Sequence, residues 1–189
     1  QPIGKQDQYA VSIGGVNTIG FLPDGSVSID PLTLSDETKK RIENEFSLVY
    51  TGLTRPASSV LSKQKEMTSS RIQELSTLRL QAFQVRSALE RGALEEVGKL
   101  LEESWQIKRT LVDGITGERL DQLHDQLIES GATGAKLLGA GGGGFFLVHG
   151  DENMRQRLNE TLNQENRVLP LLIDEQGSTI IHDDGKRWG

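Results

Sequence analysis

The residues with the clearest capacity for chemistry form a glycine run. The segment KLLGAGGGGFFLV (Lys136–Val148) places glycine at five of the six positions from Gly139 to Gly144. Glycine loses more backbone entropy on folding than any other residue, so this concentration indicates either positive φ angles or a close approach to the backbone. A loop of exposed N–H groups forms a nest that is able to hold phosphate. Lys136, just upstream, supplies a positive charge.

Two well-known phosphate-binding motifs do not fit this run. Gly139, Gly141 and Gly144 satisfy the pattern G-x-G-x-x-G literally, but a dinucleotide site requires a strand before the glycines and a helix after them. The surrounding pattern instead predicts a helix and a loop before the run and the strand FFLV after it. A Walker A loop requires Gly-Lys-Ser/Thr, and Phe145 and Phe146 occupy that place. A glycine turn that only allows close packing of a strand stays open as the alternative.

A second candidate for anion binding comes after the segment YTG. Arg55 lies directly beyond this strand end, and Ser58 and Ser59 lie at the expected start of a helix. A strand-to-helix junction presents backbone N–H groups together with such side chains, which suits a phosphate. A solvated arginine beside Pro56 is an equally good interpretation of the same residues.

Trp105 and Lys108 lie about one helical turn apart, so they share a helix face. A tryptophan on an apolar stripe is more typical of a core than of a substrate site. The three histidines, His124, His149 and His182, are scattered and lack the spacing of zinc ligands. We therefore expect no metal site made by the protein itself.

Composition narrows the class of protein. The chain has 189 residues, of which 35% are hydrophobic and 25% charged, as in globular proteins. Its formal net charge of −6 argues against a general nucleic-acid or anionic-membrane surface, so any cations that bind an anion must be local. The absence of cysteine excludes disulfides and thiolate chemistry. We expect a cytoplasmic protein with small-molecule partners.

The elements that must position these residues are predicted by hydrophobic spacing and turn chemistry. Alternating apolar residues at 14–22 and 26–30, joined by Pro23-Asp24-Gly25, predict a β-hairpin. A helix start is expected near Ser35 and a buried strand at 46–52. Apolar residues spaced by three and four predict helices with three core-facing stripes: Ile72, Leu75, Leu78, Ala82, Val85 and Leu89; Leu94, Val97, Leu101 and Trp105; Leu120, Leu123 and Leu127.

After the glycine run we expect the strand FFLV, a helix with Met154, Leu158 and Leu162, and two strands, at 167–174 and 178–183, with a turn at Gly177. From Phe46 onward this order predicts an α+β fold, with helices layered on a mostly antiparallel sheet. Residues 1–30 are typical of the tail of a different domain.

Separated stretches of the chain together resemble the GHMP kinase superfamily. GAKLLGAGGGGFFLV is similar to its third conserved motif, and IGKQDQYAVSIGG (Ile3–Gly15) resembles the segment that carries the catalytic aspartate, which is Asp7 here. YTGLTRPASSVL (Tyr50–Leu61) and ESWQIKRTL (Glu103–Leu111) are similar to the sugar-phosphate branch of the superfamily. The resemblance covers essentially the whole chain.

The resemblance implies a division into two domains. Residues 1–30 would be the last elements of a ribosomal-protein-S5-like N-terminal domain, and 31–189 a ferredoxin-like C-terminal domain. The family's phosphate loop, of the type P-x-x-x-G-L-G-S-S, does not occur in this sequence. We therefore expect the C-terminal portion of a kinase about twice as long, with the missing N-terminal half as its partner.

The resemblance also implies an activity, the ATP-dependent phosphorylation of a sugar or sugar phosphate, with the anomeric hydroxyl of heptose 7-phosphate as the expected acceptor. Magnesium would arrive with ATP and be held largely by its phosphates. Asp7 would accept the hydroxyl proton or orient the hydroxyl, and Lys5 would favour its ionised form. Helix capping is the alternative role of Asp7. The expected substrate-binding residues are Lys5, Arg55, Ser58 and Lys108; those expected to support the nucleotide phosphates are Lys136, Gly139, Gly141, Gly142, Gly143 and Gly144.

Two alternatives stay open beside this hypothesis. The first keeps the superfamily but changes the acceptor to another sugar, such as fucose or galactose, which would not need the charge near Arg55. The second is a non-catalytic binding or subunit module of the same ancestry, which the missing phosphate loop favours. A homodimer is compatible with either.

Overall fold

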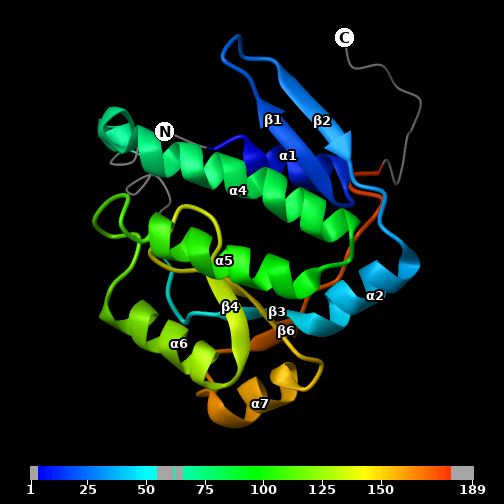
Figure 1. Ribbon diagram of the computed structural model, residues 1–189. Coiled ribbons are helices and arrows are strands. Elements are labelled where there is room, and N and C mark those ends of the chain that lie inside the picture. Colours follow the sequence, from blue (N-terminus) through cyan, green and yellow to red (C-terminus); the bar gives the residue numbers. More distant parts are fainter. Residues whose placement is uncertain (1–3, 55–61, 63–65, 180–189) are drawn as a thin grey trace, which may run out of the picture. The chain divides into compact units, whose positions relative to one another are not determined.

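The computed structural model describes residues 4–54, 62 and 66–179, which form two compact units (Figure 1). The larger unit contains Leu34–Leu172. The smaller unit contains Gly4–Thr33 and the chain from Ile173 onward. Crossing a lipid bilayer would take a longer and more apolar helix than any in the described part of the chain.

The smaller unit contains the predicted hairpin. Helix α1 (Gln6–Ile13) precedes the antiparallel strands β1 (Asn17–Phe21) and β2 (Val27–Pro31). At the turn, the Asp24 carboxylate accepts hydrogen bonds from the Ser26 N–H at 2.9 Å and the Ser26 hydroxyl at 2.6 Å. These bonds lower the pKa of Asp24. The hairpin is confirmed because its turn chemistry is local.

The chain returns to this unit near its end. The Gly15 N–H donates to the Asp174 carbonyl at 2.6 Å, and a Cβ on Gly14 would lie 2.3 Å from the Gly177 nitrogen. The units thus divide the chain at 33/34 and again at 172/173, whereas the sequence predicts one boundary after residue 30. The identity of the two predicted domains stays a prediction.

A four-stranded antiparallel sheet organises the larger unit. Its strands are β3 (Phe46–Tyr50), β4 (Ala132–Leu137), β5 (Phe145–Gly150) and β6 (Val168–Pro170), in the spatial order β4-β5-β3-β6. Helices connect β3 to β4 and β5 to β6, while β4 and β5 are joined by the glycine loop. This is a ferredoxin-like α+β arrangement, as predicted. The predicted strand at 167–174 is shorter in the structure, and most of the one at 178–183 lies outside the described residues.

The helices of this unit are α2 (Asp36–Glu45), α4 (Ile72–Glu90), α5 (Leu94–Lys108), α6 (Glu118–Glu129) and α7 (Met154–Thr161), with a 3₁₀ turn at Thr68–Arg71. In Figure 1, α5 lies between α4 and α6. The predicted helix start near Ser35 is confirmed, because the Ser35 hydroxyl accepts from the Thr38 N–H at 3.1 Å and caps α2.

The main core lies between the sheet, α5, α6 and α7. Trp105 is fully buried and meets the Phe146 ring edge-on, with 5.5 Å between ring centroids. The predicted stripes on α5 and α6 are confirmed as buried. The core residues are Val49, Trp105, Leu111, Ile115, Leu120, Leu123, Leu127, Ala132, Ala135, Leu137, Phe146, Val148, Met154 and Leu158.

The predicted core face of α4 is wrong in part. Ile72 is 61% exposed and Leu75 37% exposed, while Gln81 and Ala88 are buried. The reason is a polar contact between helices: the Ser104 hydroxyl of α5 donates to the Gln81 side-chain oxygen at 2.9 Å. A buried glutamine needs hydrogen-bond partners, and Gln81 finds one in Ser104 only when this side of α4 faces α5. The helix therefore differs from the orientation that its apolar residues alone would favour.

The segment before the glycines also differs from the prediction. The expected helix is α6, but the strand β4, rather than a loop, connects it to the glycine run. A Cβ on Gly134 would lie 2.1 Å from the Gly98 carbonyl oxygen, so β4 packs directly against the backbone of α5. This contact and pairing with β5 stabilise a strand that small residues do not favour by propensity. A dinucleotide site is still excluded, because a strand and not a helix comes after the glycines.

Candidate functional site

The glycine loop connects β4 to β5 at one end of the sheet. Its five glycines, Gly139, Gly141, Gly142, Gly143 and Gly144, all have positive φ, with values of 66°, 112°, 77°, 154° and 99°. The Leu138 N–H donates to the Phe145 carbonyl at 2.9 Å and closes the loop. Residues with a Cβ rarely adopt this conformation, so the backbone requires glycine throughout.

Close packing adds a second requirement at two of these positions. A Cβ on Gly141 would lie 3.0 Å from the Ile115 Cα, and one on Gly143 would lie 2.5 Å from the Leu53 carbonyl oxygen. Nothing lies within 4 Å of the corresponding positions at Gly139 and Gly144. The loop therefore combines crowded positions with open ones.

Backbone hydrogen bonds hold the second half of the loop. The Gly142 N–H donates to the Ile115 carbonyl at 2.8 Å, and the Gly144 N–H donates to the Leu53 carbonyl at 2.9 Å. The Gly144 carbonyl accepts from both the N–H and the hydroxyl of Thr51, at 2.9 and 3.0 Å. Two connecting segments that are remote in sequence thus fix this part of the loop.

Two half-buried lysines lie at the start of the loop. The Lys108 ammonium, at the end of α5, donates to the Leu137 carbonyl at 2.9 Å and to the Gly139 carbonyl at 2.6 Å. Burial, and then the charge of Lys136, lower the pKa of Lys108 to about 8. Burial also lowers the pKa of Lys136. Within the described residues, Lys136 has no carboxylate partner.

This arrangement has the chemistry of an anion site. In the described part of the chain, the N–H groups of Gly139, Gly141 and Gly143 have no acceptor. N–H groups in consecutive left-handed or irregular residues form concavities that bind anions, and a nearby anion would also relieve the repulsion between two lysines. The site is locally cationic although the chain carries a net charge of −6.

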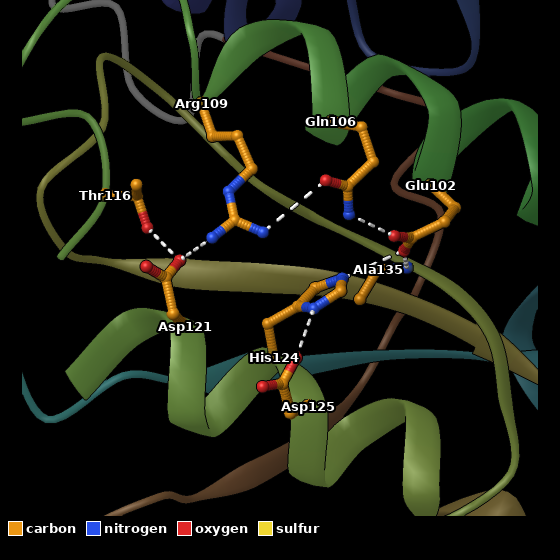
Figure 2. Close-up of polar contacts among 8 residues, drawn as sticks. All are labelled: Glu102, Gln106, Arg109, Thr116, Asp121, His124, Asp125 and Ala135. Carbon is orange, nitrogen blue, oxygen red and sulfur yellow. Dashed lines mark hydrogen bonds and ion pairs between the residues drawn. The ribbon is translucent and has the colours of Figure 1, made fainter. Parts of the chain in front are cut away.

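A polar network joins α5, α6 and β4 (Figure 2). The Glu102 carboxylate accepts from the Ala135 N–H of β4 at 3.2 Å and bonds to the His124 Nε2 at 2.9 Å. Because an ionised carboxylate only accepts, the Nε2 atom carries the proton. Burial raises the pKa of Glu102, but the hydrogen bonds from His124, Gln106 and Ala135 outweigh it and leave that pKa lowered.

The same network fixes the segment that holds Gly142. The Arg109 guanidinium pairs with the Asp121 carboxylate, which also accepts from the Thr116 hydroxyl (Figure 2). Thr116 is the next residue after Ile115, whose carbonyl binds the Gly142 N–H. Sequence reasoning missed this network because its members are separated along the chain and no motif links them.

The remaining predicted site residues belong to other segments of the chain. Asp7 is exposed in the first turn of α1, in the smaller unit, and Lys5 rather than Asp7 takes the N-cap position. No ion pair joins these two side chains in the described part of the chain. Arg55 and Ser58 lie outside the described residues, so their predicted role in binding the substrate stays a prediction.

A cavity of about 710 Å³ opens beside the loop. Tyr50 and Phe145 form an aromatic pair in its wall, with 5.2 Å between ring centroids, and Arg119 and Arg167 contribute positive charge. The Arg119 guanidinium also pairs with the Glu165 carboxylate at 2.6 Å. Sequence reasoning missed this cavity, because it is made by residues from four separate segments.

Histidine and carboxylate side chains do not converge on a metal site in the described residues. His124 and His149 are both buried and each bonds to a glutamate, Glu102 and Glu45. We assign no magnesium ligand to these residues. His182 lies outside the described part of the chain.

The sheet order and the glycine loop define a ferredoxin-like α+β domain with a candidate anion site. Residues 85–164 match the family model described as GHMP kinases C terminal. This part of the chain is therefore similar to the C-terminal domain of GHMP kinases.

Individual relatives are consistent with this family. The D-glycero-α-D-manno-heptose 7-phosphate kinase of Campylobacter jejuni is 26% identical over 164 residues, which cover 86% of this chain and 48% of that protein. The bifunctional fucokinase/GDP-fucose pyrophosphorylase of Arabidopsis thaliana is 30% identical over 171 residues, which cover 83% of this chain and 16% of that protein. The chain thus spans about half the length of the first relative and less of the second.

A solved structure supports the fold. The crystal structure of a D-glycero-D-manno-heptose 1-phosphate kinase from Bacteroides thetaiotaomicron matches with a TM-score of 0.68 and 22% identity, over 93% of this chain and 48% of that one. At this identity the likeness concerns the fold alone.

Proposed function

We propose that this chain is the C-terminal portion of an ATP-dependent sugar kinase whose acceptor is heptose 7-phosphate. The observation that carries the proposal is the locally cationic glycine loop, where N–H groups that have no acceptor among the described residues lie beside Lys108 and Lys136. The names of the bacterial and plant relatives, a heptose 7-phosphate kinase and a fucokinase, support a kinase with a sugar as the acceptor.

Phosphoryl transfer asks the protein mainly for positioning and for neutralisation of charge. In this proposal the glycine loop and Lys136 hold the nucleotide phosphates, and Asp7 accepts the proton of the sugar hydroxyl or orients that hydroxyl. Arg55 and Ser58 hold the phosphate of the acceptor. Magnesium ion travels with ATP and neutralises phosphate charge. The N-terminal half that the longer relatives possess would contribute the remaining phosphate contacts.

The deciding experiment is an assay of ATP-dependent phosphorylation with heptose 7-phosphate, fucose and galactose as acceptors. We expect Asp7→Asn to lower transfer at least 100-fold, because a neutral amide cannot accept the proton. Asp24→Asn is the matched control, since Asp24 is an exposed carboxylate in the hairpin turn of the same unit, and it should retain full transfer.

Each result has a definite meaning. Transfer that survives Asp7→Asn contradicts the assigned role of Asp7. Transfer to fucose in preference to heptose 7-phosphate supports the alternative acceptor, which the 30% identity to the plant fucokinase favours. If a folded chain is inactive even with the N-terminal half of the Campylobacter jejuni relative added as a separate chain or by fusion, it is a binding module instead.

A further inference from the structure

The contact between Lys108 and the start of the glycine loop is built on a rigid base. Helix α5 is fixed to β4 in two ways: the Gly98 carbonyl packs against Gly134, and the Glu102 carboxylate binds the Ala135 N–H. The Lys108 ammonium extends from the end of this helix to two carbonyl oxygens, at 2.9 Å from Leu137 and 2.6 Å from Gly139. Its position relative to the strand is therefore set by the fold.

These bonds determine which way the first peptide units of the loop face. In a trans peptide, the carbonyl and the following N–H point in opposite directions. By binding the Leu137 and Gly139 carbonyls, Lys108 fixes the peptide units on both sides of the Leu138–Gly139 peptide, whose N–H has no acceptor in the described residues. Glycine alone would not select this orientation, because it has many backbone conformations of similar energy. In the described part of the chain, backbone hydrogen bonds close the loop between Leu138 and Phe145, and backbone carbonyls and Thr51 hold its later positions, Gly142 and Gly144.

We propose that Lys108 is the positioning residue of the glycine loop: its ammonium holds the Leu137 and Gly139 carbonyls so that the Gly139 N–H between them stays available to an anion. The description of the loop as an anion site rests on the proposed function. The anchoring by Lys108 does not, and it can be measured without a ligand.

The described charged groups near the Lys108 ammonium are engaged in pairs of their own, except Lys136. Arg109, the first residue after α5, is paired with Asp121, and Glu102 is engaged by His124, Gln106 and Ala135. Of the described charged groups, Lys136 on β4 is the one that acts on the pKa of Lys108, which burial and this charge lower to about 8. The bonds to the two carbonyls are charge-assisted below that pH and weaken above it.

The first test is amide hydrogen exchange of the whole chain at pH 6.5, read by NMR. Lys108→Met keeps the aliphatic stem and removes the donor, so exchange of the Leu138 and Gly142 amides should accelerate at least tenfold. Lys108→Arg, which keeps a donor, should restore protection in part. Lys99→Met is the matched control, because Lys99 lies on the same helix but pairs with Glu95 on the surface. The amides of α5 and α6 report that each variant is folded.

The second test monitors the glycine ¹³Cα shifts from pH 6.5 to 9.5. In the unmodified chain the shifts of residues 139–144 should titrate together with a midpoint near 8. Lys136→Met should raise this midpoint, and Lys108→Met should abolish the titration. If Lys108 only filled space, the glycine shifts would show no titration with this midpoint. Unchanged exchange and an unchanged titration in Lys108→Met would overturn the proposal.

Binding of tripolyphosphate, as a probe for nucleotide phosphates, separates the two proposals. We expect Lys108→Met to weaken its affinity at least tenfold. If tripolyphosphate does not bind the unmodified chain but the exchange and titration results hold, the anchoring stands and the proposed phosphate site fails. If it binds equally well after Lys108→Met, the loop does not depend on Lys108 and the positioning role is wrong.

Discussion

At the scale of single residues, the glycines of the loop divide into two kinds that sequence could not distinguish. All five have positive φ, so each would be strained by a side chain. Gly141 and Gly143 also lie against neighbouring backbone, at Ile115 and Leu53, whereas nothing lies within 4 Å of a Cβ on Gly139 or Gly144. Glycine at the open positions allows the loop its backbone conformation. Glycine at the crowded positions also allows the loop to pack against the rest of the domain.

This division predicts different costs for the same substitution. Gly139→Ala should lower the free energy of unfolding by about 1 kcal/mol, the usual cost of a left-handed alanine. Gly143→Ala adds a clash with the Leu53 carbonyl and should cost at least about 3 kcal/mol. Urea denaturation of both variants measures the difference. Equal costs would mean that the loop moves away from Leu53 freely.

At the scale of elements, the contact between α5 and β4 decides the geometry of the site. The two backbones approach so closely that a Cβ on Gly134 would lie 2.1 Å from the Gly98 carbonyl oxygen. Lys108 and Glu102 both depend on this separation, because each reaches from α5 to the backbone of β4 or of the loop. A small change in helix position would therefore move several contacts at once.

Gly134→Ala tests this dependence. Its Cβ would lie 2.1 Å from the Gly98 carbonyl oxygen, so α5 must shift, and we expect a loss of about 2–4 kcal/mol of stability. Gly117→Ala is the control, since nothing lies within 4 Å of that position and its φ of 176° suits any residue. Denaturation curves give the costs, and NMR shifts at Lys108 report the helix movement. A Gly134→Ala chain as stable as Gly117→Ala would contradict the close contact.

At the scale of the whole molecule, buried bases make stability depend on pH. Burial lowers the pKa of His149, against the opposing effect of its hydrogen bond to the Glu45 carboxylate, and it lowers the pKa of Lys108 and Lys136. In each case the unfolded state binds more protons between the folded and unfolded pKa values. The free energy of unfolding therefore rises with pH through each of these windows.

We expect two rising limbs in a plot of stability against pH. The acid limb is the loss of stability as pH falls below about 6.5, when buried His149 must accept a proton. The alkaline limb is a gain of about 1–3 kcal/mol between pH 8 and 10.5, as the half-buried lysines lose their charge. Urea unfolding at fixed pH values measures both.

Substitutions show which side chain causes each part of the pH dependence of stability. His149→Gln should flatten the acid limb alone, and Lys108→Met should reduce the alkaline limb while Lys136 retains part of it. A stability that declines steadily from pH 8 to 10.5 in the unmodified chain would show that the lysines are not buried as charges.

Sequence by itself determined the features that depend on neighbours along the chain. The hairpin around Asp24, the Ser35 cap, strand β3 and the buried faces of α5 and α6 are set by turn chemistry and apolar spacing, which act over a few residues. The place of the glycine loop is set likewise. The family resemblance added a catalytic role for Asp7, which stays a prediction.

Tertiary structure alone decided the rest, because it depends on contacts between residues far apart in sequence. Strand β4 forms where its small residues meet α5 and β5, and α4 turns to bury Gln81 against Ser104. Lys108 acquires its contact with Gly139 across 31 positions. No local sequence pattern predicts such contacts. Hydrophobic spacing indicates which face of a helix is buried, but not which polar group of another element that face meets.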